Sequence, residues 1–110
     1  MLINIDQFLA VEIRSGKIIS ASDNAKAKNP AYVLRIDFGG VIGIKTSSAQ
    51  ITKNYQKEDL IGKHVLAVMN FPPRNIAGVL SEVLVLATVG DEDALLITAD
   101  DRAVVGSRVA

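Results

Sequence analysis

The residue types that most often carry out chemistry are scarce in this chain. Its 110 residues include one histidine, His64, and no cysteine. The lack of cysteine excludes disulfides, thiolate ligands for zinc or iron–sulfur clusters, and a thiol nucleophile. His64 follows Lys63 at the start of an apolar stretch, and the sequence contains no Gly-x-Ser-x-Gly nucleophile elbow. We therefore expect no catalytic residue and no enzymatic activity.

Two further patterns could hold a cofactor or a metal ion, but each has a simpler explanation. The glycines of residues 39–43 lack the spacing of a dinucleotide-binding loop and suit a tight turn between strands. The acidic residues at 91–93 and 100–101 lack the regularly spaced oxygen ligands of a calcium loop. We expect solvated turns at these positions, with no cofactor and no metal site.

Basic residues are concentrated in the middle of the chain, although the formal net charge is zero. Residues 14–74 contain ten Lys and Arg against four Asp and Glu, and the segments on either side are acidic. Nucleic-acid phosphates are contacted mainly by Lys and Arg. For a neutral domain, the alternative is that the charges only solvate the surface. The candidate phosphate contacts are Lys17, Lys28, Arg35, Lys45 and Arg74.

Aromatic residues make up only 5% of the chain, which argues against a general single-strand binder that stacks bases. Phe71 is the best candidate for an exposed aromatic side chain, whereas Tyr32 and Phe38 suit a core. The composition favours recognition of a backbone shape or of a structured RNA.

Residues 70–76 read Asn-Phe-Pro-Pro-Arg-Asn-Ile and lie between two apolar stretches. Pro72 and Pro73 fix φ and remove two backbone donors, so a strand cannot continue through them. A rigid loop that carries Asn70 and Arg74 is a common way to present a binding surface. A stiff turn that only ends a strand is the alternative.

The elements that must position these residues are mostly strands. Within residues 11–18, the apolar residues lie at odd positions before Gly16 and at an even position after it. This change predicts a β-bulge that bends the first strand. A turn at 39–40 joins a second strand to a third over 41–46, and 65–69, 83–89 and 95–97 predict further strands. Alternation over 32–38 directs Arg35 outward and assigns to the core Tyr32, Leu34, Ile36 and Phe38.

A short helix is predicted over 47–57. Ser47 and Gln50 match a capping box, and Ile51 and Tyr55 share one helical face. A bent strand, a hairpin, a helix and then more strands is the order of the all-β OB-fold. This fold is a five-stranded barrel, here with a short helix between strands 3 and 4.

Two loops flank the ligand face of an OB-fold, namely those between strands 1 and 2 and between strands 4 and 5. In this chain the first is the polar segment 22–30, which carries Lys26 and Lys28. The second is the proline loop with Asn70 and Arg74. We therefore expect these two loops to lie on the same face.

Length and hydropathy set the remaining bounds. The chain fits a single domain over 1–110 with a buried core. No apolar run approaches the roughly 20 residues that a membrane span needs. Residues 1–6 have neither the basic region nor the cleavage site of a signal peptide. Together with the lack of cysteine, these features favour the cytoplasm and no membrane insertion.

Several blocks of sequence, taken together, resemble the CsaA-type tRNA-binding proteins. The blocks 47–52 (Ser-Ser-Ala-Gln-Ile-Thr) and 70–74 (Asn-Phe-Pro-Pro-Arg) are too long to match by chance. Wider relatives are the tRNA-binding domains of methionyl-tRNA synthetases and of the β chain of bacterial phenylalanyl-tRNA synthetases. The other matching positions are 29–32, 34–39, Tyr55, 60–63, 75–76 and 81–86.

The resemblance implies an OB-fold homodimer that binds tRNA without strict sequence preference. The dimer contact would involve the region 95–110 and the N-terminal side chains of Ile3, Ile5 and Phe8. The five basic residues above would contact phosphates. Base edges or 2′-hydroxyl groups near a tRNA end would be read by Asn70, Ser81 and Glu82. The side chains of Ser47, Ser48 and Gln50 could join them, although their capping box is the competing explanation.

The resemblance also brings a second function. CsaA proteins are described as chaperone-like factors linked to protein export, so unfolded or preprotein clients are alternative partners, bound through exposed apolar patches. This chain departs from the family in having Asn29 and Val33 where a basic residue is common, and Ser15 where Val is common. Fewer basic groups predict weaker or more salt-sensitive RNA binding. An enzyme site that unites His64 with Glu82 would need a deep polar pocket, which nothing in the sequence predicts.

Overall fold

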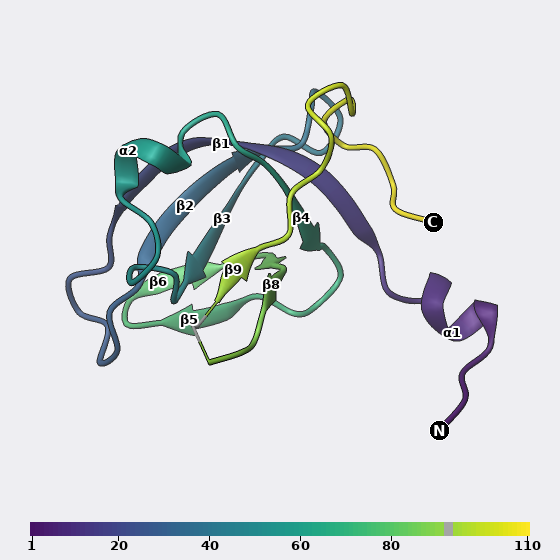
Figure 1. Ribbon diagram of the computed structural model, residues 1–110, viewed down its shortest axis with the longest axis horizontal. Helices are drawn as coiled ribbons and strands as arrows, with labels where there is room; N and C mark the ends of the chain where they lie inside the picture. Colours follow the sequence, from purple (N-terminus) through teal and green to yellow (C-terminus); the bar gives the residue numbers. More distant parts are fainter. Residues whose placement is uncertain (92–93) are drawn as a thin grey trace.

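The computed structural model describes residues 1–91 and 94–110. Its main sheet has five antiparallel strands in the order β3-β2-β1-β4-β7, and it curls into a barrel (Figure 1). The predicted all-β, OB-type barrel is therefore confirmed. The strands of this sheet are β1 Ile13–Asp23, β2 Tyr32–Asp37, β3 Ile44–Ala49, β4 His64–Val68 and β7 Leu84–Val85.

The barrel is closed between β3 and the segment that leads into β7. The Glu82 backbone N–H donates to the Thr46 carbonyl oxygen at 2.7 Å. In return, the Thr46 N–H donates to Glu82 Oε1 at 3.1 Å, and the Ser48 N–H donates to Ser81 Oγ at 3.0 Å. Two side chains thus take the place of the carbonyl acceptors that a neighbouring strand would supply to the edge of β3.

The alternation predicted for β2 is confirmed by its burial. Leu34 and Ile36 are fully buried, and Phe38 and Tyr32 are nearly so, whereas Arg35 is exposed. The four buried side chains pack with Ile18 of β1 and Val65 of β4 in one cluster inside the barrel. An apolar face that recurs every second residue can bury itself only against the inside of a curled sheet.

The first strand is bent as predicted, but the irregularity lies further along it. The pairing of β1 with β2 shifts register between Ile18 and Ser20, while Gly16 sits in a regular stretch opposite Val65. The position of Gly16 has a different cause: a Cβ there would lie 2.6 Å from side-chain atoms of both Ile36 and Phe38. Gly16 therefore lets the core approach the β1 backbone.

The helix between strands 3 and 4 exists, but the predicted capping box at Ser47 and Gln50 is wrong. Ser47 lies within β3 opposite Leu34 and is 1% exposed. The helix α2 spans only Lys57–Leu60, and its N-cap Gln56 makes no side-chain cap bond. Ser47 faces the barrel interior because β3 continues the two-residue alternation of its partner.

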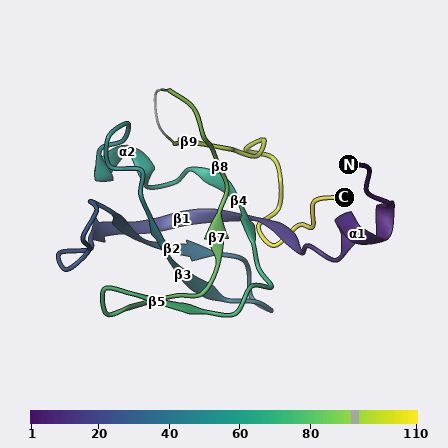
Figure 2. The ribbon, with the colours of Figure 1, turned by 90° about the horizontal axis from the view of Figure 1, so that it is seen from below.

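Two small hairpins complete the β structure. The chain after the proline loop forms β5 Arg74–Ile76 and β6 Val79–Ser81, joined by a turn in which Ala77 and Gly78 have positive φ. The single strand expected over 83–89 is broken, because β7 pairs with β4 and β8 Ala87–Thr88 pairs with β9 Leu95–Leu96. Figure 2 shows β5 and β9 on opposite sides of the main sheet.

The N-terminal helix α1, Ile5–Leu9, stands away from the barrel on the side where the chain also ends (Figures 1 and 2). It has its own capping box between Asn4 and Gln7, but none of its residues is buried. Side-chain bonds from Asn70 and Arg108 hold the chain just after it. None of the described helices is long and apolar enough to cross a membrane.

Candidate nucleic-acid interface

The two loops expected to flank a ligand face do lie side by side. The β1–β2 loop, residues 24–31, is tied to the β5–β6 hairpin by Asn24, whose Nδ2 donates to the Ile76 carbonyl oxygen at 3.1 Å. Asn24 is 8% exposed, so this bond is shielded from water. The loop with Lys26 and Lys28 is thereby held beside the hairpin that begins at Arg74.

Two grooves run along this face and meet in the middle. The first, which we name the proline groove, has a volume of about 420 Å³ and lies between Phe71, Arg74 and Leu84. The second, the lysine groove, lies between Lys26, Lys28 and Gln50. The two grooves share Ser48 and Ile76 as lining residues, so they form one continuous surface.

A third depression extends the surface past Gln50 toward Lys53. The basic residues that line the three grooves are Lys26, Lys28, Lys53 and Arg74, against one acidic residue, Glu82, among the described lining residues. The Glu82 carboxylate accepts from the Thr46 N–H and lies 3.7 Å from Lys45 Nζ. The surface is therefore positive, which suits an anionic backbone.

Cations on this surface are available to a ligand. Lys26, Lys28 and Arg74 are exposed, and none of them has an ion pair with a described residue. Nearby Asp23 is paired instead with Lys57, at 2.9 Å from Oδ2 to Nζ, and this hydrogen bond raises the pKa of Lys57. The one acid at the end of β1 thus has its own cation and does not neutralise the lysine groove.

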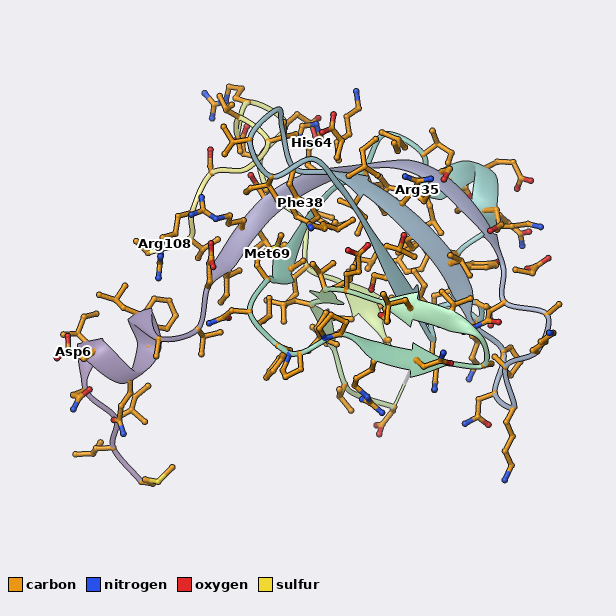
Figure 3. The ribbon with its side chains drawn as sticks, turned by 180° about the vertical axis from the view of Figure 1, so that it is seen from behind. Asp6, Arg35, Phe38, His64, Met69 and Arg108 are labelled. Atoms are coloured by element: carbon orange, nitrogen blue, oxygen red, sulfur yellow. The ribbon has the colours of Figure 1, made fainter. Side chains whose placement is uncertain are left out.

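Three of the five predicted phosphate contacts lie outside these grooves. Figure 3 shows Arg35 beside β2, away from the β5–β6 hairpin. Lys17 is exposed on β1 opposite Asp37 and His64. Lys45 is opposite Ile36, so it faces the inner side of the sheet at the barrel end, where it pairs with Glu82. Arg35 and Lys45 therefore cannot contribute to one flat surface.

The three predicted base-reading residues all have structural partners. Asn70 accepts the Glu12 N–H at 2.9 Å and donates to the Ala10 carbonyl oxygen at 2.8 Å, so both ends of its amide hold the N-terminal segment. Ser81 and Glu82 close the barrel, as described above. Ser81 and Glu82 also line the proline groove, but Asn70 does not.

Sequence reasoning did not include Lys26 or Lys53 among the candidate site residues, and it kept Gln50 only as an alternative to a helix cap. Gln50 follows β3 and lines the lysine groove. Its position after a six-residue alternating strand is the signal that could have placed it there. Lys26 lies in the predicted loop, so the loop itself was the signal. Nothing in the local sequence of Lys53 marks it as a groove residue.

The structure offers no catalytic arrangement among the described residues. His64 lies opposite Lys17, and the groove that contains Glu82 does not include it. His64 Nδ1 is buried without a hydrogen-bond partner. The part of the chain that the structure describes contains no group of three His, Asp or Glu side chains that could hold a metal ion.

A small antiparallel barrel with a basic, grooved loop face is typical of a domain of the OB-fold class. The chain belongs to the family described as the putative tRNA binding domain, whose model matches residues 13–108. Its resemblance to CsaA proteins, predicted from sequence blocks, is confirmed by the solved structures that it matches.

Two such structures are CsaA chaperones. The protein from Picrophilus torridus is 46% identical with a TM-score of 0.93, over 99% of this chain and 100% of that one. The protein from Bacillus anthracis is 42% identical with a TM-score of 0.91 over both full chains. Among curated sequences, the methionine–tRNA ligase of Protochlamydia amoebophila is 37% identical over 91% of this chain. This chain spans only 14% of that ligase.

Proposed function

We propose that this protein is a tRNA-binding module whose ligand face is the continuous surface formed by the proline groove and the lysine groove. The observation that carries the proposal is that Lys26, Lys28 and Arg74 are exposed on one surface and have no ion pair with a described residue. The domain that carries them belongs to the family described as the putative tRNA binding domain. Residues 1–110 act as one domain in this proposal, in the cytoplasm where tRNA is found.

The binding mechanism follows from the groove residues. Lys26, Lys28 and Arg74 contact phosphates, which gives affinity without sequence information. The hydroxyl groups of Ser48 and Ser81 line the groove and can bond 2′-hydroxyl groups or base edges. This face holds few groups that read bases, so we expect binding without strict sequence preference. Its described lining residues include no nucleophile–base pair, so we expect binding without catalysis.

The first test is binding of purified protein to bulk tRNA across a salt series, with an unfolded polypeptide as competitor. We expect binding that weakens steeply as salt rises, because each phosphate contact releases counterions. We also expect the polypeptide to leave the RNA bound. Failure to bind tRNA at low salt would rule the proposal out.

We also propose that the protein is a homodimer that uses its N-terminal helix. The segment 3–9, which contains α1, carries apolar side chains that are 60% (Ile3), 67% (Ile5) and 40% (Leu9) exposed. A five-residue helix is not stable without packing. A second copy that covers this helix and the neighbouring C-terminal segment would bury these apolar side chains and double the charged surface.

The dimer is tested by replacing Ile5 with aspartate. A charge buried at an apolar interface is costly, so we expect Ile5→Asp to move the mass measured by sedimentation equilibrium from two chains toward one. The matched control is Val89→Asp, because Val89 is 99% exposed on the turn after β8. A wild-type mass of one chain would contradict the dimer.

Binding of polypeptide clients is the second candidate function. One observation favours it, namely that the walls of the proline groove are mainly apolar, with Pro72, Val83 and Leu84 among them. This function predicts binding that persists at moderate salt, because apolar contacts are not screened. Displacement of tRNA by the polypeptide in the first test would favour this candidate.

A further inference from the structure

The ring of Phe71 is positioned to stack against a planar group of a ligand. Among the residues that the structure describes, Phe71 is the one exposed aromatic side chain, at 53%, while Phe38 and Tyr32 are nearly buried. Phe71 lies in the wall of the proline groove, and the two prolines after it fix the backbone that holds it. A rigid, exposed ring loses little conformational entropy when a partner stacks on it.

The rest of the proline groove suits one planar ring with polar edges. Pro72, Ile76 and Leu84 supply apolar surface around a volume of about 420 Å³, which lies within the range of small-molecule pockets. The groove also contains the Ser81 hydroxyl, which accepts the Ser48 N–H at 3.0 Å. A hydroxyl that accepts one bond keeps its own proton, which can be donated to an acceptor on a base edge.

The charges next to the groove indicate which planar group it takes. Arg74 lines the groove, is exposed, and has no ion pair with any residue that the structure describes. The lysine groove with Lys26 and Lys28 continues from it. An apolar peptide side chain would make no use of these cations. An RNA nucleotide can use both the apolar groove and the cations, because the faces of its base are apolar and its phosphate is anionic.

We propose that the proline groove receives a single unpaired base of an RNA, stacked on Phe71, while the adjoining phosphates lie along Arg74 and the lysine groove. This inference rests on the proposed tRNA binding and specifies the structural feature that is recognised. Shape and charge draw a folded RNA to the surface, and an extruded base fixes its position. Because every base has an aromatic face, this contact does not require a particular sequence.

The test compares two RNA hairpins that carry the same number of phosphates. One has a single bulged 2-aminopurine, and the other has an abasic site at the same position. Stacking on an aromatic side chain is worth about 1–3 kcal/mol per base, or roughly 5- to 150-fold in affinity. We therefore expect the base-containing hairpin to bind more tightly by such a factor and its fluorescence to change on binding.

The variant Phe71→Ala should remove that difference and leave the affinity for the abasic hairpin unchanged. The matched control is Leu80→Ala, because Leu80 is 54% exposed on the neighbouring strand and does not line the groove. Circular dichroism and thermal unfolding confirm that both variants are folded.

Each contrary outcome points to a different failure. Equal affinity of the wild-type protein for the two hairpins, with a steep salt dependence, would overturn base insertion and leave the proposed function standing. No binding of either hairpin or of tRNA at low salt would overturn both proposals. Displacement of the fluorescent base by an apolar peptide at constant phosphate affinity would assign the groove to polypeptides and overturn the inference.

Discussion

Replacing Lys28 and Arg74 together with alanine should reduce tRNA affinity at least tenfold near 0.1 M salt, with the magnitude set by counterion release. Both side chains are exposed cations without a described ion pair, and they lie on the two grooves that share Ser48 and Ile76. Each phosphate contact contributes about 0.7–0.9 to the slope of log affinity against log salt. The slope should therefore fall by about 1.5 for each ligand face that contacts the RNA.

The matched control is the double variant Lys17→Ala with Arg35→Ala, which removes the same charge from the same domain. Lys17 and Arg35 are exposed as well, but they lie on β1 and β2 outside the grooves. We expect this variant to change the slope by much less, because its charges act only through the screened long-range field. An equal loss in both variants would mean that net charge, and not the grooved surface, governs binding.

The sequence predicted the parts of the fold that depend on a regular repeat of apolar residues within one segment. The strand β2 is an example, since Tyr32, Leu34 and Ile36 recur every second residue and all three are buried. It was also predictable that the β1–β2 loop and the proline loop lie side by side, because the order of elements determines which loops meet in an OB-fold. Lys28 and Arg74 were placed on one face on that basis, and each lines one of the two adjoining grooves. Their contact with a ligand stays a prediction.

The sequence was less informative where a residue's position depends on a partner that is distant in sequence, and the capping box is the clearest error. Ser47 and Gln50 have the spacing of a helix cap, but β3 continues through Ser47 because the sheet pairs it with Leu34. Arg35 and Lys45 are both basic and lie in one hairpin, yet the register directs them to opposite faces. A register cannot be read from either strand alone, because it is set by the pair.

Polar residues in loops are also difficult to assign from sequence, because a structural role and a ligand contact favour the same residue types. Asn70, two residues before the prolines, looks like a ligand-binding residue, and the structure shows both ends of its amide bonded to the backbone of Ala10 and Glu12. Ser81 and Glu82 supply acceptors that the edge of β3 would otherwise lack. A buried backbone donor without a partner is costly, so such residues can be essential to the fold without contacting any ligand.

At Glu82, a role in closing the barrel and a role in contacting RNA can be tested separately. Glu82→Ala should lower the free energy of unfolding by about 2 kcal/mol, because it leaves the Thr46 N–H at the edge of β3 without its acceptor. Glu82→Gln is the matched variant, since an amide oxygen can accept the same bond. It should retain nearly all of the stability, because the lost ion pair with Lys45 is 3.7 Å long and about one-third exposed.

The measurements are urea unfolding and tRNA affinity for the three proteins. If Glu82 closes the barrel, Glu82→Gln should bind tRNA as well as the wild type or better, because it removes the one acidic side chain among the described residues of the proline groove. If the carboxylate instead reads the RNA, Glu82→Gln should lose affinity while its stability is unchanged. A stable Glu82→Ala variant would contradict the barrel-closing role, because the edge of β3 would then be satisfied without this side chain.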